Sequence, residues 1–305
     1  MNSEVIDEFQ ATSARPLYAT LSYATAFGLG AIDVDEWQTA LLTRAIPTST
    51  WLDALGCYPL TVFGPSPDLQ AGLERLRQAG FVSVALVPDP LTCASPEVLA
   101  QTFEICRPFK THYLIDREAG PVRFAKNHRW SVRKSYKSCS FEPVDLWQNL
   151  DVWLKLYGHT VTRHGVTGIQ AFGHSYFRQL AKMASVSALA AKCQGEIVAM
   201  ILWVRSGEIV YAHLEGGSPA AYKTHATYGL IAAANEYFAD CQIIHLGGAA
   251  GLDAEAESGL THFKRGFANR EVTAYFCGSC LDHSRYSILA GDQPPTSFFP
   301  AYRQS

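Results

Sequence analysis

The sequence predicts a mixed α/β (α+β) fold in two tandem halves, residues 1–145 and 146–305. In both halves, short apolar segments bounded by glycine or proline alternate with amphipathic segments of helical spacing. In the second half, QG and SG pairs separate three apolar segments, as in antiparallel hairpins. With 305 residues, 48% of them hydrophobic, the chain is long enough for two ordinary domains. We therefore expect mixed sheets flanked by helices.

The first half predicts a strand, helix, strand unit. YPLTVFG at 58–64 and the segment 81–90 are apolar and suit strands, and residues 68–80 between them have helical spacing and end in glycine. A helix capped by Ser95, with proline at its first position, comes next. The segment THYLID, at 111–116, then predicts a further strand.

The second half predicts two helices, three antiparallel strands, a long helix, a strand, a short helix and a last strand. The first helix is amphipathic and ends at Gly165. The three strands are expected at 186–193, 196–205 and 208–216, and residues 220–241 have the pattern of one continuous helix. QIIHLGG predicts the next strand, and a proline-punctuated tail predicts an irregular end.

Composition argues against a secreted or membrane-spanning protein. The first ten residues carry acids where a signal peptide needs basic residues, and no segment approaches the ~18 uninterrupted apolar residues of a membrane span. We expect a cytoplasmic protein. Most of the eight cysteines lie in apolar, strand-like context, so the eight are expected to be reduced thiols. The pair at 277–280 lacks a second cysteine pair, so no metal site is predicted.

Positive charge is concentrated in one predicted helix, at about 122–138, although the net charge is only -3. Four cations fall along one face at steps of three and four, with an aromatic residue beside them: Lys126, Arg129, Arg133, Lys137 and Trp130. We expect this face to bind phosphates, with His128 and Trp130 stacking on a base or sugar. The alternative is a solvated face with counter-ions. Arg163, near the end of the next helix, extends either interpretation.

Several motifs resemble the FemXAB family. HRWSVRKSYKSC, LYGHTVTRHGV, LEGGSPAAYKTHATYGLIAAANEYFADCQIIHLGGAAG and GLTHFKRGFA occur in that family's order and spacing, over roughly residues 105–278. The resemblance implies two GNAT-like acyltransferase domains side by side, which transfer an amino acid from aminoacyl-tRNA to an amine. Relatives in the family are labelled acetyltransferases. The long coiled-coil arm that some members insert is absent from this sequence, so no coiled-coil insertion is expected.

Lys264 is the principal catalytic candidate, because the resemblance assigns the lysine of the FK pair to the reacting carbonyl. Acyl transfer builds negative charge on that oxygen, and a fixed cation stabilises it. Phe263 and Phe267 flank the lysine and are expected to exclude water. The alternative is a lysine that extends from an amphipathic turn into solvent.

Other candidates for the acyl site are less specific. Gly247 and Gly248 are expected to form its backbone wall, and Glu215 and Tyr222 to contribute to substrate binding. For a general base the sequence offers Glu215 and four histidines, His213, His225, His245 and His262. His262 adjoins the lysine. His213 and His245 lie in predicted strands, where a histidine is more typical of the core. An acidic loop, Asp253, Glu255 and Glu257, either attracts a cationic acceptor or is solvated.

We therefore expect an enzyme that forms an amide bond, with aminoacyl-tRNA as donor and a small molecule or peptide as amine acceptor, and without a cofactor. Coenzyme A is the alternative donor. However, the glycine-rich turn that holds its pyrophosphate in GNAT enzymes is replaced by AAYKTHATYG, in which only Gly229 remains, inside the helix. A third possibility is a non-catalytic protein that binds phosphate or nucleic acid. A monomer or simple dimer is expected.

Overall fold

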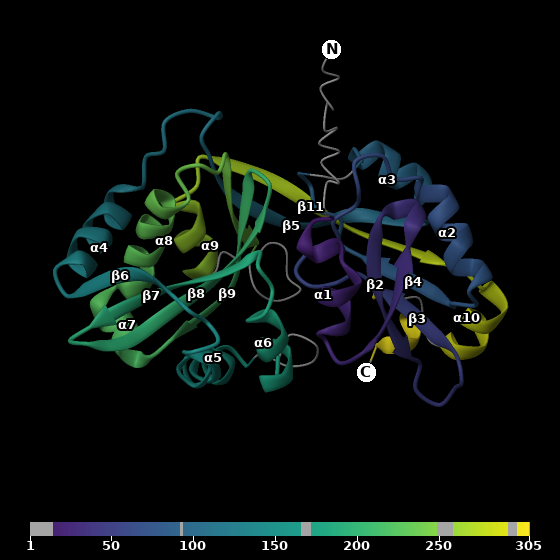
Figure 1. The fold of residues 1–305 in the computed structure, drawn as a ribbon. Helices are drawn as coiled ribbons and strands as arrows, with labels where there is room; N and C mark the ends of the chain where they lie inside the picture. Colours follow the sequence, from purple (N-terminus) through teal and green to yellow (C-terminus); the bar gives the residue numbers. More distant parts are fainter. Residues whose placement is uncertain (1–14, 92–93, 166–171, 249–258, 292–297, 305) are drawn as a thin grey trace, which may run out of the picture.

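A computed structural model describes residues 15–91, 94–165, 172–248, 259–291 and 298–304. Within these residues, one continuous sheet of 11 strands runs through the molecule in the order β1-β2-β3-β4-β11-β5-β10-β9-β8-β7-β6 (Figure 1). The strands are β1 (Gly30–Val34), β2 (Thr39–Ala45), β3 (Leu52–Leu55), β4 (Ser83–Leu86), β5 (Ile105–Asp116), β6 (Cys139–Val144), β7 (Val186–Cys193), β8 (Glu196–Ser206), β9 (Ile209–Gly217), β10 (Ile243–Gly248) and β11 (Arg270–Cys280). The β3–β4 and β9–β10 pairs are parallel and the other neighbouring strands are antiparallel.

Helices cover the sheet in both parts of the chain (Figure 1). Toward the end of the sheet that carries β1 lie α1 (Leu21–Thr25), α2 (Leu69–Gln78), α3 (Pro96–Thr102) and α10 (His283–Ala290). Toward the end that carries β6 lie α4 (Lys126–Tyr136), α5 (Leu150–His164), α6 (His174–Leu180), α7 (Pro219–Thr224), α8 (Ala226–Tyr237) and α9 (Gly259–Arg265). The mixed α/β fold predicted from the sequence is confirmed.

Strand β11 joins the two parts, because it pairs with β4 on one side and with β5 on the other. The last strand of the chain therefore completes a sheet begun in the first half. Helix α4 packs against α8, and β6 pairs with β7, so residues 126–144 lie with the second half. The division of the chain into domains at residue 145 stays a prediction.

The core follows the alternation of strand side chains. On β8, Met200 and Leu202 belong to the same apolar cluster as residues of α5, α6 and α1, whereas Ile201 and Trp203 belong to the cluster beneath α8 and α9. The first of these clusters contains Tyr18 and Tyr23 together with Trp153 and Phe177 of α5 and α6. Burial of apolar surface therefore ties the beginning of the chain to its second half.

The second-half elements agree closely with the sequence pattern. Strands β7, β8 and β9 lie where they are predicted, and their turns contain Gln194 and Gly195, with positive φ, and Gly207, also with positive φ. The helix over 220–241 is instead two helices, because His225 adopts a left-handed conformation with φ 58° between α7 and α8. Gly229 lies inside α8 as expected, where a Cβ atom would come within 2.1 Å of Phe141 Cζ.

Two other expectations are wrong. Residues 58–64 form no strand: Thr61 makes a single bridge to Pro88, and Pro59 has no N–H to donate to a ladder. The cysteines are not all reduced, because Cys139 and Cys193 form a disulfide. These two residues face each other in the register of β6 and β7, 54 positions apart in the chain, which the local sequence does not indicate. Over the described ranges, no helix has the length and apolar character needed to cross a bilayer.

Candidate functional site

Lys264 lies on α9 with its ammonium directed at the end of β10. Its Nζ donates a hydrogen bond to the carbonyl oxygen of Gly248 at 2.6 Å. Burial lowers the pKa of Lys264 to about 8, against the opposing effect of Glu215, and Lys110 lowers it further. The nitrogen is therefore held against the protein in a partly dehydrated position, and the alternative of a lysine that extends into solvent is wrong.

Gly247 and Gly248 leave room for this contact. Gly247 has a φ of 76°, and a Cβ atom on it would lie 3.2 Å from Lys264 Nζ. A Cβ atom on Gly248 would lie 2.8 Å from Cδ2 and 2.9 Å from Nε2 of His112, which is too close for any other residue without movement. The expected backbone wall at these two glycines thus borders both the lysine and a histidine. The predicted acidic loop after these glycines, with Asp253, Glu255 and Glu257, lies outside the described residues.

Two buried histidines lie behind the glycines, on neighbouring strands. The backbone N–H of Gly247 donates to Nδ1 of His245 at 3.2 Å, and Nε2 of His245 lies 3.2 Å from Nδ1 of His112. Burial lowers the pKa of His245 to about 3, and burial and His245 hold that of His112 well below its usual range. Lys264 lowers both pKa values further. Both rings are therefore neutral at physiological pH.

Glu215 lies close enough to Lys264 and to Tyr222 to influence the pKa of each. The Glu215 carboxylate accepts a hydrogen bond from Oγ1 of Thr227 at 2.9 Å, and its pKa is raised by burial although Lys264 acts to lower it. Arg163 lies over the ring of Tyr222, with Cζ 3.7 Å from the centroid, and Glu215 is one of the charges that influence the pKa of Tyr222. The structure thus brings Lys264, Glu215, Tyr222 and Arg163 into one region.

Phe263 and His262 occupy different surroundings on α9. Phe263 is partly buried, with its ring 4.9 Å from that of Tyr228 and 5.2 Å from that of Phe267. His262 is exposed and lies two positions before Lys264, which places it about 200° away around the helix. The structure does not bring His262 together with the lysine nitrogen.

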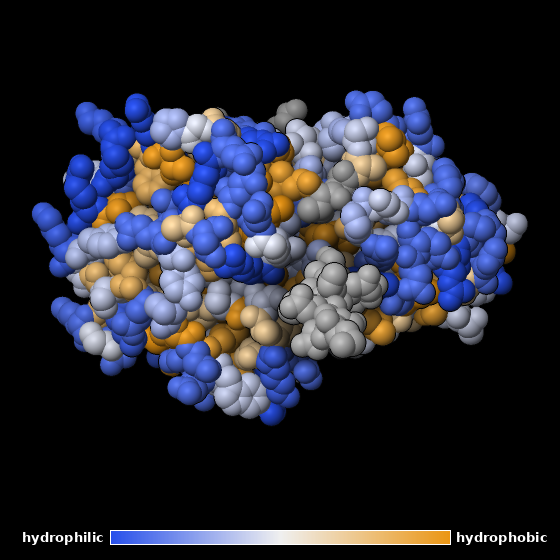
Figure 2. All heavy atoms as spheres, turned by 45° about the horizontal axis from the view of Figure 1, so that its top comes forward, coloured by the Kyte–Doolittle hydropathy of each residue, from blue (hydrophilic) through white to orange (hydrophobic). Residues whose placement is uncertain are grey.

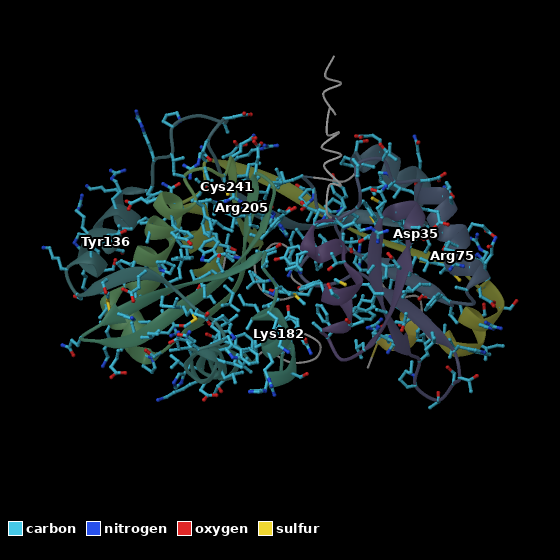
Figure 3. All side chains as sticks on the ribbon, viewed as in Figure 1. Asp35, Arg75, Tyr136, Lys182, Arg205 and Cys241 are labelled. Carbon is cyan, nitrogen blue, oxygen red and sulfur yellow. A yellow bond between two sulfur atoms is a disulfide. The ribbon has the colours of Figure 1, made fainter. Side chains whose placement is uncertain are left out.

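The basic helix presents its cations to solvent. The side chains of Lys126, Arg129, Arg133 and Lys137 are exposed, and Trp130 is 53% exposed beneath the ammonium of Lys134. Helix α4 lies at the outer edge of the molecule, as Tyr136 near its end shows in Figure 3, and that edge carries hydrophilic side chains in Figure 2. These cations form a separate surface, which we call the α4 face.

His128 does not belong to the α4 face, so its expected stacking on a base or sugar is wrong. It is 1% exposed and donates from Nε2 to the carbonyl oxygen of Phe263 at 2.9 Å. At about 100° per residue, His128 lies roughly 100° to 200° around the helix from the exposed cations. His213 and His245, by contrast, are buried and hydrogen-bonded, as strand context predicts.

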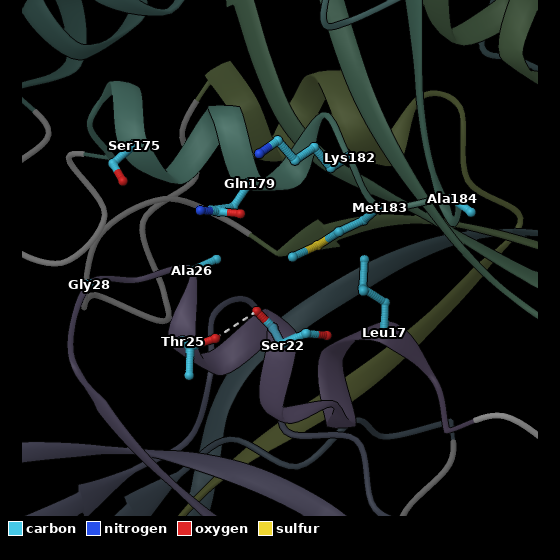
Figure 4. A pocket seen from close by; sticks show the side chains of 10 residues that line it. All are labelled: Leu17, Ser22, Thr25, Ala26, Gly28, Ser175, Gln179, Lys182, Met183 and Ala184. Atoms are coloured by element: carbon cyan, nitrogen blue, oxygen red, sulfur yellow. Dashed lines mark hydrogen bonds between the residues drawn. The ribbon is translucent and has the colours of Figure 1, made fainter.

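A cavity of about 650 Å³ opens elsewhere, between α1 and α6 (Figure 4). Ser22 and Thr25 of α1 face Ser175 and Gln179 of α6 across it, and Leu17 and Met183 line its side. None of the residues predicted to act in catalysis or substrate binding lines this cavity.

The sequence reasoning missed His112, Lys110 and Thr227. His112 and Lys110 lie on β5, and the register of β5 with β10 brings His112 opposite Gly248, 136 residues away. A histidine inside the apolar segment THYLID is the only local sign. Thr227 appears from the sequence as an ordinary helix residue, and only the approach of β9 to α8 reveals its bond to Glu215.

Comparison with solved structures identifies the fold. A crystal structure of FemX is similar with a TM-score of 0.60 at 12% identity, over 82% of this chain and 86% of that chain. The C-terminal domain of a putative lysylphosphatidylglycerol synthetase from Agrobacterium fabrum gives 0.55 at 16% identity, over 82% of each chain. L-PGS from Bacillus licheniformis gives 0.56 at 14% identity, over 86% of this chain and 92% of that chain. No protein-family model and no curated protein matches the sequence. The chain therefore has a FemX-like fold, as the motifs led us to expect.

Proposed function

We propose that this protein is an aminoacyltransferase that moves an aminoacyl group from tRNA to the amine of a small molecule or peptide. The observation that carries the proposal is the ammonium of Lys264, held at 2.6 Å from the Gly248 carbonyl in a site dry enough to lower its pKa to about 8. A cation so placed stabilises an anion far more than it would in water. The likeness of the fold to FemX and to the domain of a putative lysylphosphatidylglycerol synthetase supports the same chemistry.

The reaction is amide formation from an activated ester. The lone pair of the neutral acceptor amine attacks the ester carbonyl carbon, a C–N bond forms, and the carbonyl π electrons move onto oxygen. The ammonium of Lys264 stabilises that oxyanion through N–H groups that Gly248 leaves free. When the intermediate collapses, the bond to the tRNA ribose oxygen breaks, and the proton released by the amine passes to that oxygen.

Glu215 favours an aminoacyl group over a plain acyl group. Its carboxylate is partly buried, is oriented by Thr227 and lies within the field of Lys264. An α-ammonium group would pair with it, whereas an acetyl group carries no cation to do so. The turn before α8 is also occupied by side chains, because His225 contacts Lys134 and Thr227 bonds to Glu215. This leaves fewer free groups for the pyrophosphate of coenzyme A.

The α4 face supports tRNA as the carrier of the donor. Its exposed cations have no acids on neighbouring turns, and the exposed Trp130 offers a ring on which a base stacks. The helix is also linked to α9 through His128 and Phe263, so polyanion bound on the α4 face would lie on the element that braces Lys264.

A donor assay tests the proposal. The purified protein is incubated with charged tRNA or with acyl-CoA, each with a panel of amines and with phosphatidylglycerol vesicles, and donor loss and product are measured. We expect loss of charged tRNA and a new amide. Lys264→Met should lower kcat by roughly 10² to 10³, the range found for removal of an oxyanion donor. Lys155→Met, an exposed lysine on α5, is the matched control and should retain full activity.

Each of the other outcomes of this assay rejects one part of the proposal. Loss of acyl-CoA alone rejects the tRNA donor, and an ester of phosphatidylglycerol rejects the amine acceptor. Consumption of neither donor leaves the non-catalytic alternative, and full activity of Lys264→Met removes the lysine from the mechanism.

A further inference from the structure

The hydrogen bonds of His245 and His112, next to the two glycines, determine which ring nitrogen of His112 carries the proton. The backbone N–H of Gly247 occupies Nδ1 of His245, so the neutral His245 ring carries its proton on Nε2. That Nε2–H donates to Nδ1 of His112 at 3.2 Å. The neutral His112 ring therefore carries its own proton on Nε2. The donors in this relay of hydrogen bonds therefore all point one way, from the N–H of Gly247 to His245 and from His245 to His112.

The Nε2–H of His112 faces the glycine segment that also holds Lys264. A Cβ atom on Gly248 would lie 2.9 Å from Nε2, and Gly248 is the same residue whose carbonyl oxygen accepts from Lys264 Nζ. Among the described residues, His112 has its one hydrogen bond at Nδ1, to His245, and no acceptor is bonded to Nε2. His112 is only 6% exposed as a whole, but its Nε2 is not among the described polar atoms that are fully buried without a partner. A ligand can therefore reach this donor and supply its acceptor.

We propose that His112 is a second hydrogen-bond donor to the acyl oxygen of the substrate, acting beside Lys264, and that His245 is the residue that orients it. The proposal rests on the proposed acyl transfer and adds a residue to its oxyanion site. Two donors of different kinds then border the same oxygen: an ammonium that supplies charge and a neutral imidazole that supplies direction. A neutral imidazole donor adds no third positive charge beside Lys264 and Lys110, whose pKa values are already lowered.

The geometry of amide side chains provides a sharp test of His112. The amide nitrogen of glutamine reaches the position of Nε2, whereas an asparagine side chain reaches only that of Nδ1. His112→Asn therefore keeps a partner for His245 but loses the donor at Gly248, and we expect kcat to fall by roughly 10² with KM for the donor nearly unchanged. His112→Gln should recover a large part of that loss.

The orienting role of His245 needs a readout other than stability. In ¹⁵N-labelled protein, nitrogen shifts and two-bond couplings report which ring nitrogen carries the proton. We expect the Nε2–H tautomer at both histidines. His245→Phe should abolish the single tautomer at His112 and lower kcat, and His245→Gln, which keeps a donor for His112, should restore both.

His213→Asn is the matched control, because His213 is also a buried, neutral histidine, but it bonds Tyr18 and Tyr176 away from the glycines. It should lower stability and leave kcat within about twofold. An active wild-type enzyme in which His112→Asn matches wild-type kcat overturns the proposal for His112 while the proposed function stands. Nδ1–H at His112 overturns the relay. A wild-type protein that consumes neither charged tRNA nor acyl-CoA overturns the proposed function and, with it, the donor role of His112.

Discussion

Nε2 of His128, on the basic helix, donates a hydrogen bond to the carbonyl oxygen of Phe263 at 2.9 Å, one residue before Lys264. A second bond runs from the backbone N–H of Ala125 to the carbonyl oxygen of Gly266 at 2.8 Å. Helix α4 therefore braces α9 on both sides of the lysine. The surface proposed to hold the tRNA and the residue proposed to act on the acyl oxygen therefore belong to two helices that are joined by these hydrogen bonds.

Loss of the His128 bond should affect both stability and turnover. His128→Leu keeps a side chain of similar bulk but removes the donor of the Phe263 carbonyl. We therefore expect the free energy of unfolding to fall by about 1–3 kcal/mol. His128→Gln, which keeps a donor, should lie closer to wild type in both urea unfolding and kcat. Equal stability of His128→Leu and wild type would show that the bond does not hold α9.

The pH dependence of the rate should have a descending limb near pH 8. The acceptor amine must be neutral, so the rate first rises with pH, and it falls once Lys264, with a pKa of about 8, loses the proton that stabilises the oxyanion. Lys264→Arg keeps its charge over this range, so the limb should disappear even if the maximum rate is lower.

Substitution of two charged neighbours of Lys264 should shift the descending limb of the pH profile in opposite directions. Lys110 lowers the pKa of Lys264 and Glu215 raises it, while His112 and His245 facing it are neutral. Lys110→Met should therefore move the limb to higher pH and Glu215→Gln to lower pH, measured as kcat against pH. A limb that stays in place in both variants belongs to another group.

Salt dependence tests the α4 face. Each cation that neutralises a phosphate releases a counter-ion, so Arg129→Gln and Arg133→Gln should each reduce the slope of log affinity for tRNA against log salt concentration by roughly 0.7 to 1. Arg75→Gln is the matched control, because Arg75 is exposed on α2 at the opposite end of the molecule (Figure 3). An unchanged slope in both α4 variants would indicate a solvated face.

The local sequence predicts elements well where one rule decides them. β7, β8 and β9 alternate, and glycine-containing pairs turn between them, so their bounds follow from period and turn chemistry. The break at His225 could not be predicted, because no glycine or proline marks it and every residue of AAYKTHATYG tolerates a helix.

The site was predictable only in part, for a related reason. Lys264 and the two glycines belong to recognisable motifs close together in the chain. His112 joins them through the register of β5 with β10, and His128 turns inward because α4 packs on α8 and α9. Such partners are set by long-range packing, so single-sequence patterns gave His128 the wrong role and His112 none.

Acid should destabilise the protein through its buried neutral histidines, and His213 is the best one to isolate. The hydroxyl of Tyr23 donates to the carbonyl oxygen of Tyr58, so the hydroxyl of Tyr176 must donate to that of Tyr23. Nε2–H of His213 then donates to the hydroxyl of Tyr176, and the hydroxyl of Tyr18 donates to Nδ1 of His213. Both ring nitrogens are thus occupied by partners that suit the neutral ring, and burial lowers the pKa of His213 to about 3.

The sign of the effect follows from the two pKa values. Between the unfolded value of about 6.5 and the folded value of about 3, the unfolded chain binds a proton that the folded chain does not, so stability falls as pH falls. The loss should approach about 1.4 kcal/mol per pH unit for this residue. His213→Gln keeps a donor and an acceptor without a titrating group, and should reduce the slope of unfolding free energy between pH 6 and about pH 4, measured by urea unfolding. His159→Gln, at an exposed position on α5, should leave that slope unchanged, and a similar change in both variants would show that the slope arises elsewhere.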